Sequence, residues 1–427
     1  MNKSKKLYKI PILGFLSIII IGAVLLELPI CKQKPIPFLD ALFVSTSGTC
    51  ITGFTPVVIS EQFTFIGQLV LLTLIELGAL GFMTVIVTIA TLAQKKVTVS
   101  DAMLFENGDF QAGFKQRARN IVRFTLVIEA IGAILLSFRF VPIFGLAKGI
   151  WYSIFHSIAA FCNSGFDILG RASFSGFAND YYVNFVVMAL IILGGIGFLV
   201  LEDLINAWKK KSIKHLRLQS KIVLVTTAAL ITIPTIIIKI TEPSLNLIQS
   251  MFITVNLRTA GFYSTNMANL TQGTKLLSIL LMFIGGAPGS TSGGIRIITF
   301  AVLILAMLST LKNRKEVVVF YRKISGAYIM KAITITGLSM FVILIAVITI
   351  ALTSNLGLEG IIFNCVSAYS TVGLGLISTS VLNSIGKIAI MLLMFVGRVG
   401  PMVAFRLFFD TNDEDEDVEH VDGELIL

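Results

Sequence analysis

The stretch Ser370-Thr371-Val372-Gly373-Leu374-Gly375 decides the organisation of this chain, because three related stretches occur earlier in the sequence. They are Cys50-Ile51-Thr52-Gly53-Phe54, Cys162-Asn163-Ser164-Gly165-Phe166 and Arg258-Thr259-Ala260-Gly261-Phe262. Each follows a short apolar segment and ends in glycine plus a bulky apolar residue. The four glycines Gly53, Gly165, Gly261 and Gly373 are 112, 96 and 112 positions apart. Four such loops in one polypeptide predict four similar units.

The composition is that of a membrane protein. Of the 427 residues, 55% are hydrophobic and 14% are charged, and the mean hydropathy is +0.89. Soluble domains carry about 25% charged residues. The length allows roughly eight crossings of ~20 residues, together with re-entrant loops. The first apolar run, residues 10–28, is too long for a signal-peptide core and lacks a following cleavage site, so it is predicted to be the first membrane helix.

The net charge of +10 comes from basic residues that are gathered in bands. These bands fall in residues 3–9, 95–123, 209–221 and 312–331, and they hold 22 of the 34 Lys and Arg residues. An excess of Lys and Arg marks cytoplasmic loops, so the amino terminus and these loops are predicted to be cytoplasmic. Membrane spans separate the bands, which argues against nucleic-acid binding. The acidic run 410–417 predicts a solvated cytoplasmic tail, with docking on a basic partner as the alternative.

Each predicted unit has a long apolar helix, a short half-apolar segment, the glycine loop and a second long helix. The short segments (38–49, 150–161, 245–256 and 359–369) are too short to cross a ~30 Å hydrocarbon core. Both ends of a unit should therefore lie on the same side, as the charge bands also indicate. The predicted units are residues 1–98, 99–212, 213–320 and 321–409, followed by the tail 410–427. The predicted long helices are 10–29 and 63–92, 121–138 and 182–208, 222–240 and 276–311, and 329–352 and 385–409.

This arrangement predicts a cation pathway. A half-length helix that ends inside the membrane directs its carboxy-terminal carbonyls, equivalent to about −0.5 charge, toward the loop that follows. Backbone carbonyls in such a loop can replace the hydration shell of a dehydrated ion, and the fourth loop is close to the Thr-Val-Gly-Tyr-Gly filter of potassium channels. Four glycine turns between packed helices are the alternative. The predicted ion-binding residues are Ile51, Thr52, Gly53, Asn163, Ser164, Gly165, Thr259, Ala260, Gly261, Thr371, Val372 and Gly373.

With these four loops the chain resembles the membrane subunits of the Trk/Ktr/HKT superfamily of potassium transporters, and most closely the Ktr branch, over residues 10–409. The resemblance implies an all-α polytopic membrane protein with eight transmembrane helices in four pseudo-fourfold helix–pore-loop–helix repeats and one ion pore per subunit. It also implies a homodimer and potassium as the transported ion. A cytosolic KtrA-like nucleotide-binding regulatory ring would contact the basic inner loops, with sodium as a potential activator. The chain itself shows no nucleotide-binding pattern and no cofactor site.

Three of the second long helices carry a glycine signature, two glycines three positions apart: Gly78 and Gly81, Gly194 and Gly197, and Gly397 and Gly400. In the third unit a longer glycine-rich stretch takes its place. Residues 285–294 are all small or proline, and such a stretch cannot hold a continuous helix. The second long helix of the third unit is therefore predicted to be broken. The resemblance implies that this stretch is an intramembrane gating loop, whereas a kink for close helix packing is the alternative. A nucleotide loop is disfavoured because no Gly-Lys-Ser/Thr follows. The predicted gate comprises Gly285, Gly286, Ala287, Pro288, Gly289, Ser290, Thr291, Ser292, Gly293, Gly294 and Arg398.

Several polar residues lie in apolar surroundings. Arg398 would be costly in a membrane helix unless it faces a cavity or a partner; the resemblance implies that it lines the pore near the gate, and a buried pair with Glu76 is the alternative. Arg258 is predicted to tie its loop to a neighbour, and His156 to be a packed core residue. Asp40 and Asp167 either enrich cations at the outer mouth or are exposed loop carboxylates. The four cysteines (Cys31, Cys50, Cys162, Cys365) are predicted to be small packing residues.

The predicted function is therefore potassium uptake across the plasma membrane, in contact with membrane lipid, with both termini cytoplasmic. A sodium-selective protein, a secondary active transporter of another small cation, and a membrane scaffold without transport remain as alternatives. No arrangement of Ser, His and Asp or of paired carboxylates suggests hydrolysis, so the chain is not predicted to be an enzyme.

Overall fold

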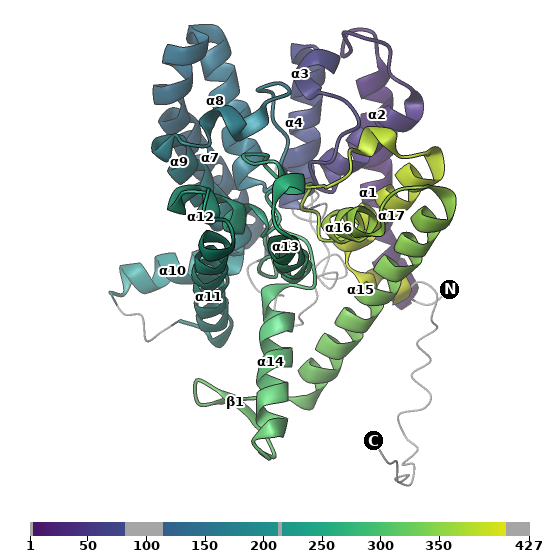
Figure 1. The fold of residues 1–427 in the computed structure, drawn as a ribbon. Coiled ribbons are helices and arrows are strands. Elements are labelled where there is room, and N and C mark those ends of the chain that lie inside the picture. The colour runs from purple at the N-terminus through teal and green to yellow at the C-terminus, as the bar shows by residue number, and fades with distance from the viewer. Residues whose placement is uncertain (1–2, 82–113, 212–215, 407–427) are drawn as a thin grey trace.

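The computed structural model describes residues 3–81, 114–211 and 216–406, with side chains placed from Ile12 and Ala118 onward in the first two ranges. Parts of the basic bands (including Lys95 and Lys96), the predicted helix end at 82–92 and the acidic tail lie outside the described residues. Most of the described chain is helical. Figure 1 shows helices arranged around a centre where several irregular loops meet.

Four long helices are each followed along the chain by a shorter helix that packs against them. The short helices end where the sequence predicts, at Thr49, Phe161, Asn256 and Tyr369. A glycine follows each end within four or five residues, and the helical hydrogen-bond pattern stops before it. The long helices are α1 (Lys3–Glu27), α7 (Phe114–Phe144), α11 (Leu218–Thr241) and α15 (Gly326–Thr353), and the short ones are α2 (Phe38–Thr49), α8 (Leu146–Phe161), α12 (Leu247–Asn256) and α16 (Leu358–Tyr369).

The second helices are shorter than predicted. The break in the third is confirmed, but continuous helices over 63–92, 182–208 and 385–409 are wrong. A glycine with positive φ lies at each of the three breaks: Gly81 (φ 76°) and Gly400 (φ 97°) directly follow α4 and α17, and Gly197 (φ 95°) directly precedes α10. This conformation is accessible to glycine and incompatible with a right-handed helix. The segments are α4 (Phe65–Leu80), α9 (Tyr181–Gly195), α10 (Phe198–Lys209), α13 (Gln272–Ile284), α14 (Ile297–Leu311), α17 (Ser384–Val399) and α18 (Pro401–Arg406).

The bend between α9 and α10 measures 101°, and Figure 1 shows α10 projecting sideways from the helices around it. A small hairpin, β1 (Val317–Val319) and β2 (Arg322–Ile324), lies in the predicted inner loop after α14. Its turn residues Phe320 and Tyr321 both have positive φ (47° and 61°), as in a type I′ turn. This hairpin was not predicted from the sequence. The remaining short helices are α3 (Ile59–Gln62), η2 (Ser173–Phe177), η4 (Met267–Asn269) and η5 (Thr379–Val381).

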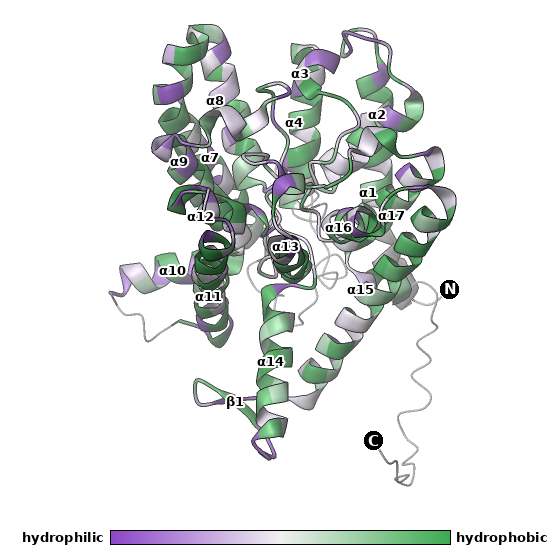
Figure 2. Cartoon of the chain, viewed as in Figure 1, coloured by the Kyte–Doolittle hydropathy of each residue, from purple (hydrophilic) through white to green (hydrophobic). Residues whose placement is uncertain are grey.

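Three of the described helices are long and apolar enough to cross a membrane, Ala118–Phe144, Leu218–Thr241 and Gly326–Thr353, and a fourth span arises if α9 and α10 are one bent segment. Six shorter apolar helices accompany them. Figure 2 shows that apolar residues dominate the helices, including α14 and α15. On α7 the large side chains of Leu126, Ile131 and Phe138 are exposed. An exposed apolar helix surface is expected where lipid is the solvent.

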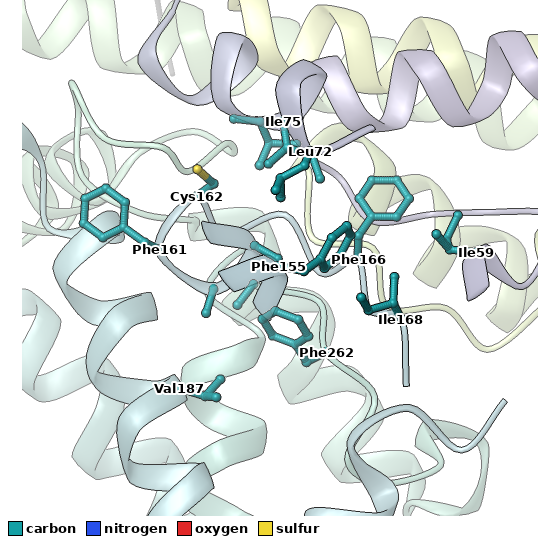
Figure 3. Close-up of a cluster of buried hydrophobic side chains, with 14 of the residues drawn as sticks. Ile59, Leu72, Ile75, Phe155, Phe161, Cys162, Phe166, Ile168, Val187 and Phe262 are labelled. Atoms are coloured by element: carbon teal, nitrogen blue, oxygen red, sulfur yellow. The ribbon is translucent and has the colours of Figure 1, made fainter. Parts of the chain in front are cut away.

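The largest buried hydrophobic cluster joins α2, α4, α8 and α9. Figure 3 shows its centre, where Phe155 and Phe166 from the second unit lie near Leu72 of α4. A second cluster joins α13, α15, α16 and α17. The two clusters flank the region of the glycine loops and hold the short helices in place.

Candidate functional site

The four glycine loops share one backbone shape. The residue two positions before each glycine has positive φ: Ile51 (58°), Asn163 (56°), Thr259 (76°) and Thr371 (53°). The glycine itself is also positive, at 90° in Gly53, 66° in Gly165, 82° in Gly261 and 89° in Gly373. A residue with a Cβ pays for this conformation, and it occurs at the same two positions in every loop. The loops are therefore structurally equivalent despite their different side chains.

The four glycines form a closed ring. A Cβ added to any of them would come closer than 3.0 Å to the next loop in chain order, and the fourth glycine faces the first loop. The carbonyl that it would meet always belongs to the residue before the neighbouring glycine. These contacts are Gly53 with Ser164, Gly165 with Ala260, Gly261 with Val372, and Gly373 with Thr52. The structure thus brings all four predicted loops together in one place.

The ring is surrounded by hydroxyl groups that lack partners. Buried polar side chains are nearly always hydrogen-bonded, yet six hydroxyls in these loops and the helices before them have no protein partner. Oxygen atoms without a partner beside a ring of carbonyls can serve a dehydrated cation or its water. The residues are Ser47, Thr49, Thr52, Thr259, Ser370 and Thr371.

The first glycine of each signature in a second helix has a packing role. A Cβ at Gly78 would collide with the carbonyl of Thr49, at Gly194 with that of Phe161, and at Gly397 with that of Tyr369. Each of these carbonyls lies four residues before the glycine of its loop. The second helices therefore press directly on the ends of α2, α8 and α16 and fix their positions. The second glycine of each signature (Gly81, Gly197 or Gly400) lies at the helix break described above.

The predicted gate segment lies directly beneath two of the loops. The side chains of Asn163 and Ser292 are hydrogen-bonded at 3.0 Å, and the Asn163 amide also reaches the carbonyls of Ile191 and Ala160 when its oxygen accepts from Ser292. A Cβ at Gly293 would meet Thr371 Oγ1 and the Ser370 carbonyl. The segment thus touches the second and fourth loops.

The bend between α9 and α10 holds the other side of this segment. The Ala287 N–H donates to the Gly195 carbonyl at 3.0 Å, and the Phe198 N–H donates to the Gly289 carbonyl at 2.9 Å. Arg296 donates to the carbonyls of Ser292 and Ala287. Most of the segment is buried, although Gly289 is exposed. It is a tightly bonded loop between α13 and α14.

Arg398 bonds backbone carbonyls and not Glu76. Its Nη1 donates to the Thr291 carbonyl at 2.6 Å, and its Nη2 donates to the Gly78 carbonyl at 2.5 Å and the Ala79 carbonyl at 3.4 Å. Among the described residues Arg398 has no ion pair with Glu76, so the buried pair considered from the sequence is wrong. Arg398 joins the predicted gate segment to α4 and α17.

Other sequence predictions can be located individually. Arg258 is buried and its Nη2 reaches Thr227 Oγ1 on α11 at 3.5 Å, which ties the third loop to a neighbour as predicted. His156 is a buried core residue: its Nδ1 bonds the Tyr152 carbonyl at 2.6 Å, its Nε2 accepts from the Ile168 N–H, and aromatic rings surround it.

Neither predicted outer carboxylate is an exposed, unpaired charge. Asp40 forms a 2.5 Å ion pair with Lys387, and both side chains are only 13–14% exposed. Asp167 accepts from Ser173 Oγ and the Leu169 N–H; burial nevertheless raises the pKa of Asp167 to about 6. Both earlier interpretations of Asp40 are therefore corrected, because a neutralised carboxylate does not concentrate cations.

A cluster that was not predicted from the sequence is formed by Glu76 on α4, Glu129 on α7 and Cys162 at the end of α8. The Cys162 thiol lies 3.4 Å from Glu76 Oε2 and 3.6 Å from Glu129 Oε1. All four cysteines are buried and free, but Cys162 is more than a packing residue. Two glutamates within long apolar runs were the available signal, since buried acids are rarely without function in a membrane.

Known proteins resemble this chain in sequence over most of its length. The sequence profile of a family described as "TrkH: Cation transport protein" matches residues 15–414. The potassium/sodium uptake protein NtpJ of Enterococcus hirae is 36% identical over 97% of this chain and 95% of its own length. The Ktr system potassium uptake protein B of Bacillus subtilis is 36% identical with the same coverage. The protein of that name from Vibrio alginolyticus is 33% identical over 92% of this chain and 89% of its own.

A solved structure agrees at the level of the fold. The crystal structure of the potassium transporter TrkH from Vibrio parahaemolyticus superposes with a TM-score of 0.74 and covers 93% of this chain and 85% of its own, at 19% sequence identity. The family profile spans nearly the whole chain, and the three relatives named above, at 33–36% identity, cover 92–97% of it. The chain therefore belongs to the TrkH family of cation transport proteins.

Proposed function

We propose that this chain is the pore-forming subunit of a Ktr-like potassium uptake system and that potassium crosses the membrane through the ring of four glycine loops. The closed ring of Gly53, Gly165, Gly261 and Gly373 is the observation that carries the proposal. Two relatives with similarly complete coverage are named Ktr system potassium uptake protein B, which supports potassium as the ion.

The ring suits a monovalent cation that has lost its water. Four short helices end at the loops, and the negative ends of their dipoles favour positive charge there. The carbonyls of Thr52, Ser164, Ala260 and Val372 lie at the contacts between neighbouring loops, so they can take the place of hydration oxygens. We assign ion contact to these residues, to the four glycines, and to Ile51, Asn163, Thr259 and Thr371.

The proposed architecture is eight membrane helices in four pseudo-fourfold units, 1–98, 99–212, 213–320 and 321–409, with an acidic cytoplasmic tail. Equal φ patterns in the four loops and equal glycine contacts in three second helices support it. Each second helix would then be one span that is broken at its glycine, which accounts for the small number of uninterrupted long helices. The location is the plasma membrane with both termini inside.

Residues 285–294 and Arg398 are proposed to be the gate. The segment lies against two filter loops through Ser292 and Gly293 and is held by Arg398. In this position it would obstruct the pathway on one side of the ring. Removing residues 287–292 should raise ion flux if the segment is a gate and leave flux unaltered if it is only a packing kink.

The proposed assembly is a homodimer with one pore per subunit, regulated by a cytosolic KtrA-like nucleotide-binding ring. The names of the Ktr relatives describe them as parts of a system, which supports a separate regulatory subunit. Nucleotide would then act only through that subunit, and sodium would act as an activator.

Sodium transport is the second candidate. Three of the four loops depart from Thr-Val-Gly, and one relative is named a potassium/sodium uptake protein. Secondary active transport of another small cation is a further form of this alternative.

Rubidium uptake in cells that lack their own potassium transport tests the proposal. We expect uptake that potassium suppresses and that equal sodium does not. Gly261→Ser should reduce this preference, because the added side chain would meet the Val372 carbonyl, whereas Gly337→Ser on α15 faces open space and serves as the control. Absent uptake, or equal competition by sodium, would overturn the potassium assignment.

A further inference from the structure

The cluster of Glu76, Glu129 and Cys162 lies beside the second filter loop and is used by neither the proposed filter nor the proposed gate. Glu129 is 4% exposed and Cys162 is fully buried, while Glu76 is half-buried. One candidate ligand atom from each residue lies within 4.8 Å of the other two. Figure 3 shows the Cys162 sulfur facing the helix that carries Ile75, which is the neighbour of Glu76.

The two carboxyl groups have no basic partner. Within the described ranges, Glu76 and Glu129 hydrogen-bond each other, which places a proton between the two carboxyl groups, and both also bond Cys162; no Lys, Arg or His is among their partners. Arg398, which bonds the carbonyl of Gly78 one turn away, does not pair with either carboxyl. Carboxylates taken out of water need an opposite charge close by. A bound cation would supply it.

The separations are those of hydrogen bonds from the Cys162 thiol, and they also fit the ligand shell of zinc. Zinc binds thiolate sulfur at about 2.3 Å and carboxylate oxygen at about 2.0–2.2 Å in a tetrahedral arrangement, which places sulfur and oxygen about 3.5 Å apart. The observed separations from Cys162 Sγ are 3.4 Å to Glu76 Oε2 and 3.6 Å to Glu129 Oε1. Thiolate favours zinc over magnesium or calcium.

A fourth buried polar group lies on the same face of α7 as Glu129. Thr125 lies one helical turn before Glu129, on the buried face of α7, and i and i+4 side chains lie one above the other. Thr125 is 1% exposed, and its hydroxyl has no hydrogen-bond partner. Other helical threonines, such as Thr336 on α15, use this hydroxyl to bond the carbonyl four residues earlier. The Thr125 hydroxyl is free to complete a coordination shell directly or through water.

We propose that Glu76, Glu129 and Cys162 form a binding site for one divalent cation of the zinc class, with Thr125 as the source of the fourth ligand. The half-buried side of Glu76 gives access to the site. On binding, the Cys162 thiol proton and the proton between Glu76 and Glu129 are both released to solvent, and the sulfur joins the metal as thiolate beside two carboxylates. The ion would connect α4 and α7 to the residue before Asn163 and so brace the second filter loop. This proposal is independent of the proposed potassium transport, because its test measures metal binding and not ion flux.

The test uses the full-length protein, stripped of metal, in detergent or nanodiscs. Titration with Cd2+ should produce the ultraviolet thiolate-to-cadmium band at about one equivalent per chain, and Zn2+ should abolish it by competition. Cys162→Ser should remove the band, and Glu129→Gln should weaken binding at least about tenfold, since loss of even an outer-shell partner of a metal ligand typically costs about 10–100-fold.

Cys50→Ser is the matched control. Cys50 follows α2 as Cys162 follows α8, and it is equally buried and free, but it has no carboxylate in contact with it among the described hydrogen bonds. It should retain the band. If Cys162→Ser fails to fold, a chain in which Cys31, Cys50 and Cys365 are all serine should still show the full band. Two results would overturn the proposal: no band in the unaltered chain, or equal loss of the band in Cys162→Ser and Cys50→Ser. The first result would mean that Glu76 and Glu129 hold protons in place of a metal ion.

Discussion

Arg398 Nη1 donates to the carbonyl of Thr291 across 2.6 Å and so connects α17 to the irregular segment between α13 and α14. The two residues are 107 positions apart in the chain. The same guanidinium holds the Gly78 carbonyl on α4. One side chain thereby joins the first, third and fourth predicted units below the ring of glycines.

Arg398→Gln is expected to increase rubidium flux. The change removes charge-assisted hydrogen bonds, each worth about 1.5–3 kcal/mol, so the equilibrium between closed and open forms should shift at least about tenfold. Arg398→Lys should give a partial effect because lysine lacks the planar fork. Initial uptake rates at equal surface expression give the measurement, with the exposed Arg314→Gln as control. Unchanged flux in Arg398→Gln would contradict a role in the gate.

Gly373→Ala is expected to impair both folding and selectivity. Its positive φ of 89° costs a non-glycine residue roughly 1–2 kcal/mol, and the new Cβ would collide with the Thr52 carbonyl and Gly53. We expect at least a tenfold loss of preference for rubidium over sodium, which corresponds to about 1.4 kcal/mol. Gly337→Ala, which meets no atom within 4 Å, should keep the preference and be as stable or more so. Equal behaviour of the two variants would exclude a special role for the loop.

Asp40→Asn should destabilise the fold by about 3 kcal/mol, because it leaves the largely buried Lys387 ammonium without its partner. Thermal unfolding can be followed with a thiol-reactive dye, since all four cysteines are buried in the folded chain. The double variant Asp40→Asn, Lys387→Gln should recover most of the loss. If the double variant were less stable than the two single changes together predict, Asp40 would not stabilise the fold through its ion pair with Lys387.

Acid should weaken the contact between α3 and the segment after the second loop. The Arg171 guanidinium, 2.8 Å away, lowers the pKa of Glu61 below its ordinary value. The folded state therefore binds this proton less tightly than the unfolded state, and the stabilisation is complete above pH ~4.5 and is lost as the pH falls through the lowered pKa. Glu61→Gln should remove that part of the acid sensitivity. The effect should be small, since both groups are exposed. Unfolding temperatures of the two proteins at pH 7 and pH 3 provide the check, and parallel curves would refute it.

The local sequence was sufficient for the short helices and their loops. The end of α2 at Thr49 and of α16 at Tyr369 follows from small residues and glycine, whose backbone preferences act over a few positions. The break after Ile284 could be predicted for the same reason. The breaks at Gly81, Gly197 and Gly400 were missed because a single glycine is tolerated inside a helix at a cost of only about 1 kcal/mol, and the contacts that decide against the helix come from other parts of the chain.

Contacts between distant residues were beyond the sequence. Asp40 and Lys387 are separated by 347 positions and Glu76 and Cys162 by 86, and nothing in their neighbours indicates the pairing. The sequence left two interpretations of Arg398 open, a charge that lines the pore near the gate and a buried pair with Glu76, and only the fold shows that it bonds carbonyls. The choice depends on how the helices pack, since a buried charge takes whichever acceptors the packed helices bring within reach.

The sequence by itself determined that this is a helical membrane protein with four like glycine loops, because apolar composition, charge bands and glycine spacing act locally or add along the chain. The tertiary structure decided that each glycine faces the carbonyl of the next loop, that the broken segment lies beneath the second and fourth loops, and that two glutamates and a cysteine meet behind the second. These arrangements depend on close packing between helices, where the absence or presence of a single Cβ determines which backbone surfaces can touch.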